Sequence, residues 1–323
     1  MTRRPKPANP YYDGPRSDHF DGRLFFNPDG IEPASFTDLL RWQFGGGRAK
    51  WPARLPSPHP PAKPEPRIAA DGLRVTMVGH ATLLVQTAGL NILTDPVWSD
   101  RASPLSFAGP RRANAPGIAI ADLPPIDVVL LSHNHYDHMD IATLARLRTA
   151  HDPVLVTPLG NDRIVHKSIP DMRIAVGDWH DTVDLGHGVT VHFEPAHHWS
   201  ARGTSDRRMA LWSGFTVAAP SGNTYFAGDT GFHEGRYFRA VRDKHGRFRL
   251  AILPIGAYEP RWFMAPQHQN PSDAVEAFRI LGADHAAGMH WGTFQLTDEP
   301  AHEPRDLLHA ALDTRALPRE RFR

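Results

Sequence analysis

Short apolar runs separated by turn residues begin at Leu73 and continue through most of the chain. The stretch LRVTMVGHATLLVQTAGLNILTDP (73–96) predicts three consecutive strands, with turns near Gly79 and at Ala88-Gly89. The run DVVLLS (127–132) is almost continuously apolar, which is typical of a strand that is buried on both faces. We expect further strands in PVLVTP, GVTVHFEP, LWSGFTVAAP, TYFAGD and LAILPIG.

Two segments show the spacing of apolar residues that is typical of helices. DIATLARLRT (140–149) repeats apolar residues every three positions behind an aspartate, and PSDAVEAFRILG (271–282) begins with Pro-Ser and ends with glycine. Because strands dominate and helices lie between them, the pattern predicts an α/β (α+β) fold in which layered sheets are flanked by helices.

Residues 1–66 differ from the rest because proline is dense there, as in WPARLPSPHPPAKPEPR (51–67). Proline disfavours helices and central strands, so we predict an extended N-terminal arm over 1–66 and one domain over 67–323. Within the arm, SFTDLLRWQFG (35–45) predicts a short helix with Ser35 as its N-cap. We expect the apolar side chains of this helix to dock against the body of the protein rather than against a partner: Leu39, Leu40, Trp42 and Phe44.

Composition narrows the classes of partner. The formal net charge is +1 over 323 residues, and no basic stripe is evident, so we expect no nucleic acid partner. No apolar run follows the basic N-terminal residues, and nowhere do 18 apolar residues run together. We therefore expect no signal peptide and no transmembrane helix, and the cytoplasm is the default location, with membrane association through the 35–45 helix as an alternative. Cysteine is absent, so any metal site must use histidine and carboxylate ligands.

The stretch LLSHNHYDHMD (130–140) crowds three histidines and three aspartates or asparagines behind a predicted buried strand. On an extended backbone, side chains two residues apart share a face, so His133, His135 and Asp137 can converge. His138 can point to a neighbouring location as the chain turns into the next helix. One loop can therefore offer ligands to two metal ions about 3.5 to 4 Å apart, as in two-metal hydrolytic sites.

Other predicted strands also end in ligand residues. EPAHHWSAR places His197 and His198 after one strand, FAGDTG places Asp229 after another, and GMHWGTF places His290 after a short segment that ends in Gly288. Each residue alone is a weak signal, but together they repeat one pattern in which a histidine or aspartate follows an apolar run. Spacing alone does not separate His197 from His198.

The ordered motifs HNHYDH, HHW, GDTG and MHWGTF resemble the metallo-β-lactamase superfamily over about residues 73–295. This resemblance implies a four-layer αββα sandwich with a dinuclear site at one edge of the paired sheets. The two divalent ions are usually zinc, with Mn²⁺ or Fe²⁺ as alternatives. The resemblance also implies a ligand set in which one ion takes His133, His135 and His198, the second takes Asp137, His138 and His290, and Asp229 bridges both. It selects His198 through the His-Trp pair. For His197 we expect simple surface exposure, with a contribution to the site as the alternative.

Two further stretches, FFNPDG (25–30) and EPRWFMAPQHQNPSDAV (259–275), resemble the branch that contains N-acylphosphatidylethanolamine-hydrolysing phospholipase D. The ascorbate-6-phosphate lactonases are related to it. The resemblance implies that Gln267 and His268 lie near the active site and that Asp95 orients a ligand histidine. For His80 a role in the site and a satisfied turn histidine are equally open.

The implied reaction is hydrolysis by a hydroxide that two metal ions, bridged by Asp229, generate near neutral pH. Asp137, Asp229 and His268 would be the catalytic residues, with His268 donating a proton or binding an anionic group. A phosphodiester, cleaved as by a phospholipase D, is the first expectation for the bond. The alternatives are a lactonase or esterase for a small polar substrate and a non-catalytic metal-binding protein. The expected partners are a small-molecule or lipid substrate and, by analogy, a second copy in a homodimer.

Overall fold

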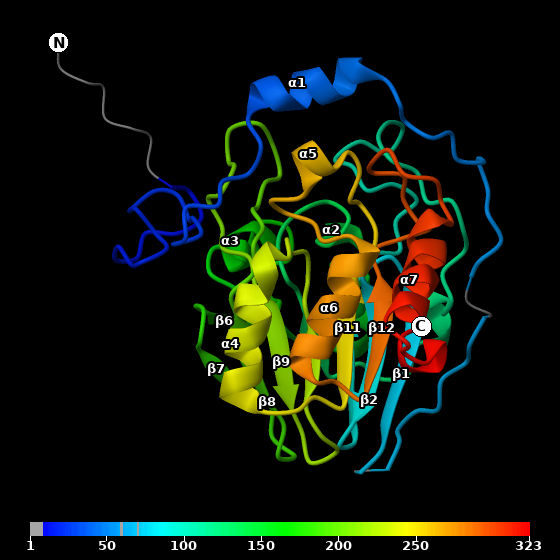
Figure 1. Cartoon of the computed structure of the whole chain (residues 1–323). Helices are drawn as coiled ribbons and strands as arrows, with labels where there is room; N and C mark the ends of the chain where they lie inside the picture. The colour runs from blue at the N-terminus through cyan, green and yellow to red at the C-terminus, as the bar shows by residue number, and fades with distance from the viewer. Residues whose placement is uncertain (1–8, 59–60, 70) are drawn as a thin grey trace.

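The computed structural model describes residues 9–58, 61–69 and 71–323, and its centre is a pair of six-stranded mixed sheets that face each other (Figure 1). The start of the predicted arm, residues 1–8, lies outside the described residues. The first sheet has the order β1-β2-β3-β4-β5-β6 and is formed by β1 (Leu73–Gly79), β2 (Thr82–Thr87), β3 (Leu90–Thr94), β4 (Val128–Leu130), β5 (Val154–Pro158) and β6 (Arg173–Gly177). The second has the order β12-β11-β10-β9-β8-β7 and is formed by β7 (Thr182–Asp184), β8 (Thr190–Glu194), β9 (Gly214–Ala218), β10 (Thr224–Phe226), β11 (Leu250–Pro254) and β12 (His285–Met289).

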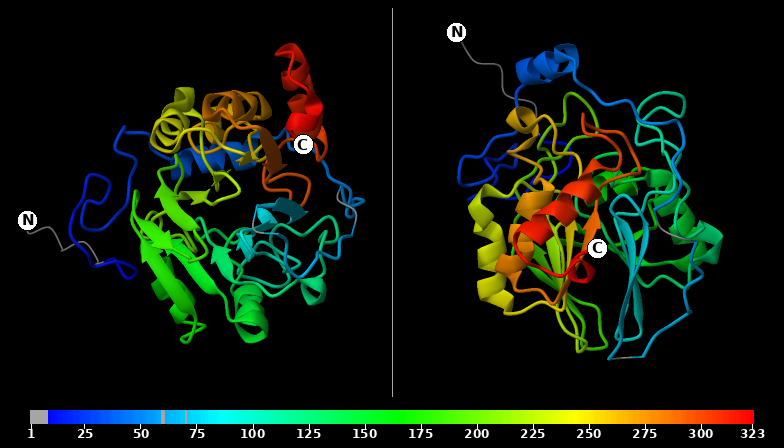
Figure 2. Two further views of the ribbon diagram at one scale, coloured as in Figure 1. Left: turned by 90° about the horizontal axis from the view of Figure 1, so that it is seen from below. Right: turned by 45° about the vertical axis from the view of Figure 1, so that its right-hand side comes forward.

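Helices cover the outer faces of both sheets, so the four-layer αββα sandwich is confirmed (Figure 2). The first sheet carries α2 (Ile141–His151) and α3 (Asn161–His166), and the second carries α4 (Arg236–His245), α6 (Pro271–Leu281) and α7 (Glu303–Thr314). Two more helices, α1 (Phe36–Gly45) and α5 (Arg261–Met264), lie above one edge of the sandwich (Figure 1). Short 3-10 turns occupy Ile120–Asp122, His233–Gly235 and Arg319–Arg321.

The apolar runs of the sequence arise because both faces of the central strands are buried. In β2, Leu83 and Val85 belong to the cluster between the sheets, which includes Phe215 of the second sheet. The intervening Leu84 belongs to a separate cluster with Leu144 of α2. Burying one such side chain contributes about 1.5 to 3 kcal/mol, so the four-layer arrangement has a large driving force.

The strand directions bring several strand ends to one edge of the sandwich. Strands β3 to β6 run parallel, as do β10 to β12, while β1 and β8 each reach the same direction through an antiparallel neighbour. The carboxyl ends of β1, β3, β4, β8, β10 and β12 therefore meet at the edge that α1 and α5 overlie (Figure 1). This is where ligands bind in open α/β sheets generally.

Helix α1 docks on the body of the protein, as predicted, but only on one side. Ser35 caps it, accepting a hydrogen bond from the Asp38 amide, and Trp42 stacks on Phe263 of α5 with ring centroids 5.0 Å apart. By contrast, Leu40 is 40% exposed and Phe44 is 85% exposed, so the expectation that all of its apolar side chains dock is wrong for these two. Within the described part of the chain, no helix is long and apolar enough to cross a membrane.

Candidate metal centre and its cavity

The loop after β4 supplies the first ligand candidates because it leaves a fully buried strand and turns at once into α2. His133, His135 and His138 lie on this loop, and Asp140 ends it by accepting hydrogen bonds from the first-turn amides of α2. Three other strands contribute one side chain each at the same edge. His198 follows β8, Asp229 follows β10 and His290 follows β12, and all three side chains are buried.

Three imidazoles form the first group of potential ligands. The His135 Nδ1 atom lies 2.9 Å from His133 Nε2 and 3.2 Å from His198 Nε2. Ring nitrogens this close, all within 4.8 Å of one another, can share one cation. The grouping of His133, His135 and His198 is the one implied by the family resemblance.

The second group is formed by Asp137, His138 and His290. The Nε2 atoms of His138 and His290 lie 3.1 Å apart, and Asp137 Oδ2 lies 3.1 Å from His290 Nε2 and 3.4 Å from His138 Nε2. His80, in the turn between β1 and β2, joins this group through its Nε2 atom, 2.9 Å from Asp137 Oδ2. The structure therefore places His80 beside the site, where the sequence left it undecided.

Asp229 lies between the two groups. Its Oδ2 atom is 3.1 Å from His290 Nε2 and 3.2 Å from His138 Nε2 on one side. On the other side it is 3.7 Å from His198 Nε2 and 4.0 Å from His133 Nε2. The second oxygen, Oδ1, is buried without a hydrogen-bond partner among the described residues. A carboxylate with one oxygen near both groups and a second oxygen that is unpaired could serve two cations.

The outer nitrogens of three candidate ligand histidines are held as in metal sites, whereas His135 Nε2 and His290 Nδ1 are buried without a described partner. His138 Nδ1 donates to Asp95 Oδ2 at 2.6 Å, and His198 Nδ1 donates to the Gln267 carbonyl at 3.2 Å. Ser132 Oγ donates to Asp95 at 2.6 Å and accepts from His133 Nδ1 at 2.9 Å. Because these partners hold the proton on Nδ1, each Nε2 lone pair points at the centre, as a metal ligand requires. Asp95 thus lies where the resemblance implies.

The same crowding perturbs the pKa values of the centre strongly. Burial lowers the pKa of His135 to about 4 and that of His133 well below its usual range. Burial opposes ionisation of Asp229 too, but the neighbouring His138 and His290 outweigh it and hold the pKa of Asp229 well below its usual value. For His290 the carboxylates outweigh burial and raise the pKa to about 9. Such opposed shifts in one cleft are characteristic of functional sites.

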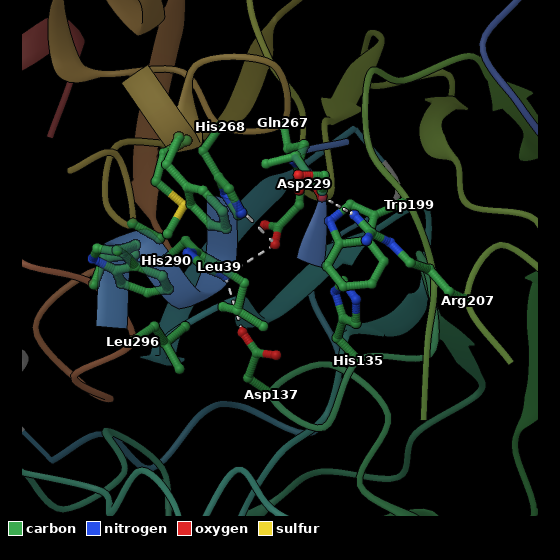
Figure 3. Close-up of a pocket in the computed structure, with 17 residues that line it drawn as sticks. Leu39, His135, Asp137, Trp199, Arg207, Asp229, Gln267, His268, His290 and Leu296 are labelled. Atoms are coloured by element: carbon green, nitrogen blue, oxygen red, sulfur yellow. Dashed lines mark hydrogen bonds and ion pairs between the residues drawn. The ribbon is translucent and has the colours of Figure 1, made fainter. Parts of the chain in front are cut away.

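A cavity of about 240 Å³ opens above the centre (Figure 3). His135, Asp137, Asp229 and His290 are the candidate ligands that line it. Gln267 and His268 line it, as implied, and the Nδ1 atom of His268 lies 4.0 Å from Asp229 Oδ2. Burial lowers the pKa of His268 to about 4. Much of the remaining wall is apolar and comes from distant parts of the chain: Leu39, Trp42, Trp199, Phe263, Met264 and Leu296.

The expected surface exposure of His197 is wrong. Its side chain is 1% exposed, and its Nε2 atom pairs with Asp29 of the arm at 2.6 Å. The ring stacks on Tyr237 at 4.2 Å, away from the metal ligands. The arm covers His197, and no local sequence signal reveals this because Asp29 lies 168 residues earlier.

Sequence reasoning also missed three residues of the site. Ser132 connects Asp95 to His133, as described above, and its adjacency to the HNHYDH motif is the only signal for it. Trp199 packs edge-on against His135 at 4.6 Å, and Arg207 lines the cavity behind it. The motif HHW contains Trp199, whereas nothing in the sequence marks Arg207.

Comparison with known proteins agrees with the fold and the clustered ligands. A sequence model described as the beta-lactamase superfamily domain matches residues 90–291. Fold and site together define a metal-dependent hydrolase of the beta-lactamase superfamily, to which the chain belongs. Within it the chain belongs to the family of N-acyl-phosphatidylethanolamine-hydrolyzing phospholipase D. It is 41% identical to enzyme 1 of that name from Caenorhabditis elegans over 253 residues, 76% of this chain and 71% of the relative.

Other relatives extend the comparison. An uncharacterized protein of Mycobacterium tuberculosis is 39% identical over 296 residues, 88% of this chain and 77% of the relative. Among solved structures, an isothiocyanate hydrolase from Delia radicum gut bacteria has a TM-score of 0.60 at 20% identity, covering 77% of this chain and 94% of its own. The metallo hydrolase Igni18 of Ignicoccus hospitalis has a TM-score of 0.54 at 19% identity, covering 74% and 91%. These two similarities show the shared fold.

Proposed function

We propose that the chain is a two-metal phosphodiesterase of the phospholipase D type. One divalent ion would be held by His133, His135 and His198, and the other by Asp137, His138 and His290. The observation that carries this proposal is the position of Asp229 Oδ2, within 4.0 Å of a ring nitrogen in both groups. Zinc is the first choice for both ions because the ligand set is rich in imidazole, with Mn²⁺ or Fe²⁺ as alternatives.

Two ions bound there would lower the pKa of a water molecule and polarise a phosphoryl oxygen. The protein residues orient the reactants around that chemistry. Asp95 fixes the His138 ring, and the Gln267 carbonyl fixes His198. His268 has a depressed pKa and is neutral near pH 7, so it serves to donate a hydrogen bond to the substrate rather than a proton to the leaving group. In the balanced reaction, water gives its hydroxyl to phosphorus, the P–O bond to the head-group alcohol breaks, and the alcohol takes the proton.

The apolar wall of the cavity favours a substrate that carries an apolar portion. Leu39, Trp42 and Phe263 would leave a small polar lactone without hydrogen-bond partners over much of its surface. The name of the Caenorhabditis elegans relative describes a lipid phosphodiester, N-acyl-phosphatidylethanolamine, and we extend this substrate class to the present chain. Leu40, Phe44 and Trp262 lie exposed on the same two helices that roof the cavity, which favours peripheral contact with a lipid surface.

The test is the identity of the products. Zinc-loaded protein is incubated with N-palmitoyl-phosphatidylethanolamine in mixed micelles, and the products are separated by mass spectrometry. The proposal expects N-palmitoylethanolamine and phosphatidic acid in equal amounts, and their loss in Asp229→Asn. Release of a lysophospholipid instead would identify an esterase, and release of palmitic acid from the amide nitrogen would identify an amidase; either result contradicts the proposal. Arg305→Gln on the exposed side of α7, where the side chain bonds only to Asp306 among the described residues, is the matched control and should retain full activity.

A further inference from the structure

Arg207 brings a positive charge into a cavity whose walls are otherwise largely apolar. Among the residues that line the cavity it is the only lysine or arginine. Its Cζ atom lies 4.3 Å above the ring of Trp199, and its Nη2 donates to the Ala34 carbonyl at 2.6 Å. Figure 3 shows the side chain reaching across Trp199 toward the cavity.

No described carboxylate forms an ion pair with Arg207, and the Coulombic influence of Glu32 reaches it only from a greater distance. Within the described ranges, no aspartate or glutamate oxygen lies within 4.0 Å of its guanidinium, whereas the adjacent Arg208 pairs with Glu32. Its Nε atom is buried without a hydrogen bond to any described residue. A partly buried cation with an unmatched donor is costly to the folded state unless a water molecule, an ion or a ligand completes it.

Trp199 connects this cation to the proposed metal centre. The indole contacts the Arg207 guanidinium on its face and packs edge-on against His135 at 4.6 Å. A molecule that fills the cavity would therefore have one end at Asp229 and the ligand histidines and another part beside Arg207. The single negative charge of a phosphodiester would be met at the metal centre, which leaves the charge of Arg207 for a different group.

We propose that Arg207 is a specificity-determining residue that binds a second anionic group of the substrate, a carboxylate or a phosphate, near the scissile phosphodiester. Its planar guanidinium suits either group through paired hydrogen bonds. The inference rests on the proposed function for the position of the phosphodiester. It extends the proposed substrate class beyond N-acyl-phosphatidylethanolamine, whose only anionic group is the phosphodiester, to phosphodiesters that carry an additional acid function next to an apolar portion.

Binding of rigid phosphonates tests this without requiring turnover. The probes are 3- and 4-carboxyphenylphosphonate, each compared with its uncharged carboxamide, and phenylphosphonate is the parent compound. Their dissociation constants are measured by calorimetry on the zinc-loaded full-length protein. For at least one isomer, the wild type should bind the carboxylate roughly tenfold more tightly than the carboxamide, the size of a charge-assisted hydrogen bond.

Substitutions identify the residue responsible. In Arg207→Gln the ratio of the two affinities should fall to about one, and Arg207→Lys, which keeps the charge, should restore part of it. Arg208→Gln removes the neighbouring charge outside the cavity and should keep the wild-type ratio. A wild type that does not distinguish the pairs, or an Arg207→Gln variant that still does, overturns the proposal.

The outcomes also separate this inference from the proposed function. If carboxylates bind in an Arg207-dependent manner while phenylphosphonate does not bind, the anion-binding role of Arg207 is supported. The proposed position of the phosphodiester at the metal centre is then contradicted. If phenylphosphonate binds only to metal-loaded protein but no carboxylate gains affinity, the metal centre stands and the role of Arg207 fails. If none of the probes binds, both fail.

Discussion

Replacing Asp29 tests whether the arm holds the loop that carries His198. The Asp29 carboxylate accepts a hydrogen bond from His197 Nε2 at 2.6 Å, with 10% and 1% of the two side chains exposed. Burial opposes ionisation of Asp29, but the hydrogen bond from His197 outweighs it and lowers the pKa of Asp29. Asn27 Nδ2 of the same FFNPDG stretch donates to the Ala196 carbonyl at 2.9 Å. The arm therefore hydrogen-bonds to the Ala196 carbonyl and the His197 side chain, directly before His198.

The magnitude follows from the type of bond. A buried hydrogen bond to a charged group contributes about 1.5 to 3 kcal/mol, so Asp29→Ala should lower the free energy of unfolding by about 2 kcal/mol. If that energy also holds His198 in its binding position, up to about 30-fold in metal affinity is lost with it. Asp29→Asn keeps an acceptor oxygen and should lose roughly half as much free energy.

Urea unfolding measures the stability, and competition with a chromophoric chelator measures the metal affinity. Arg236→Gln is the matched control: its guanidinium also contacts Asp29, at 3.3 Å, but its side chain is 63% exposed and should contribute little. A loss of stability in Asp29→Ala with metal affinity at the wild-type value would contradict the prediction that the arm positions His198. The Asp29–His197 pair would then stabilise the arm without positioning the loop that carries His198.

Three other substitutions test separate parts of the account. Asp95→Asn should weaken metal binding by about 10- to 100-fold because the ring of a ligand histidine loses its charged acceptor, and an unchanged affinity in chelator competition would contradict this. Trp42→Ala should raise KM for the micellar lipid severalfold while sparing bis(p-nitrophenyl) phosphate, whereas equal losses on both substrates would show a general defect. His19→Gln should destabilise the protein more at pH 6 than at pH 8 in urea unfolding. Burial lowers the pKa of His19, but the hydrogen bonds from His19 to Asp178 and Asp18 outweigh burial and raise this pKa. The stability that these hydrogen bonds contribute is therefore present below about pH 6.5 and is lost as pH rises through the folded-state pKa. A loss of stability in His19→Gln that is the same at pH 6 and pH 8 would contradict this prediction.

The central strands could be predicted because their environment leaves a strong sequence signal. In β2 and β3 every residue is buried, and the apolar runs mark both. The edge strands carry less signal: β6 exposes part of its length, and the sequence of β12, HAAGM, contains no β-branched residue. Pairing with β11 imposes the extended conformation on β12, and such tertiary pairing does not show in a local pattern. The polar helix α4 was missed for a similar reason, since only Phe238 and Val241 among its side chains are buried.

In the candidate site, too, the sequence indicates some residues and leaves others unmarked. Most of its ligand residues could be proposed from sequence because they follow recognisable strands whose ends converge at one edge, whereas His290 follows the weakly marked β12 and was proposed from its motif. The contacts that orient or cover those residues join distant segments instead. Asp29 meets His197 across 168 positions, and the roof of the cavity combines Trp42 of the arm with Phe263 of α5. Only the folded chain shows these pairings, so their roles in binding could not be read from spacing.

Elemental analysis of the purified protein shows directly whether two metal ions share the site. A two-metal centre would give two equivalents of zinc, or of a substituting divalent ion, per chain, with phosphodiesterase activity that chelation abolishes and readdition restores. Asp229→Asn should fall below two equivalents because both ions lose their shared ligand. A single equivalent that supports full activity, or activity that survives complete removal of metal, would contradict the two-metal centre.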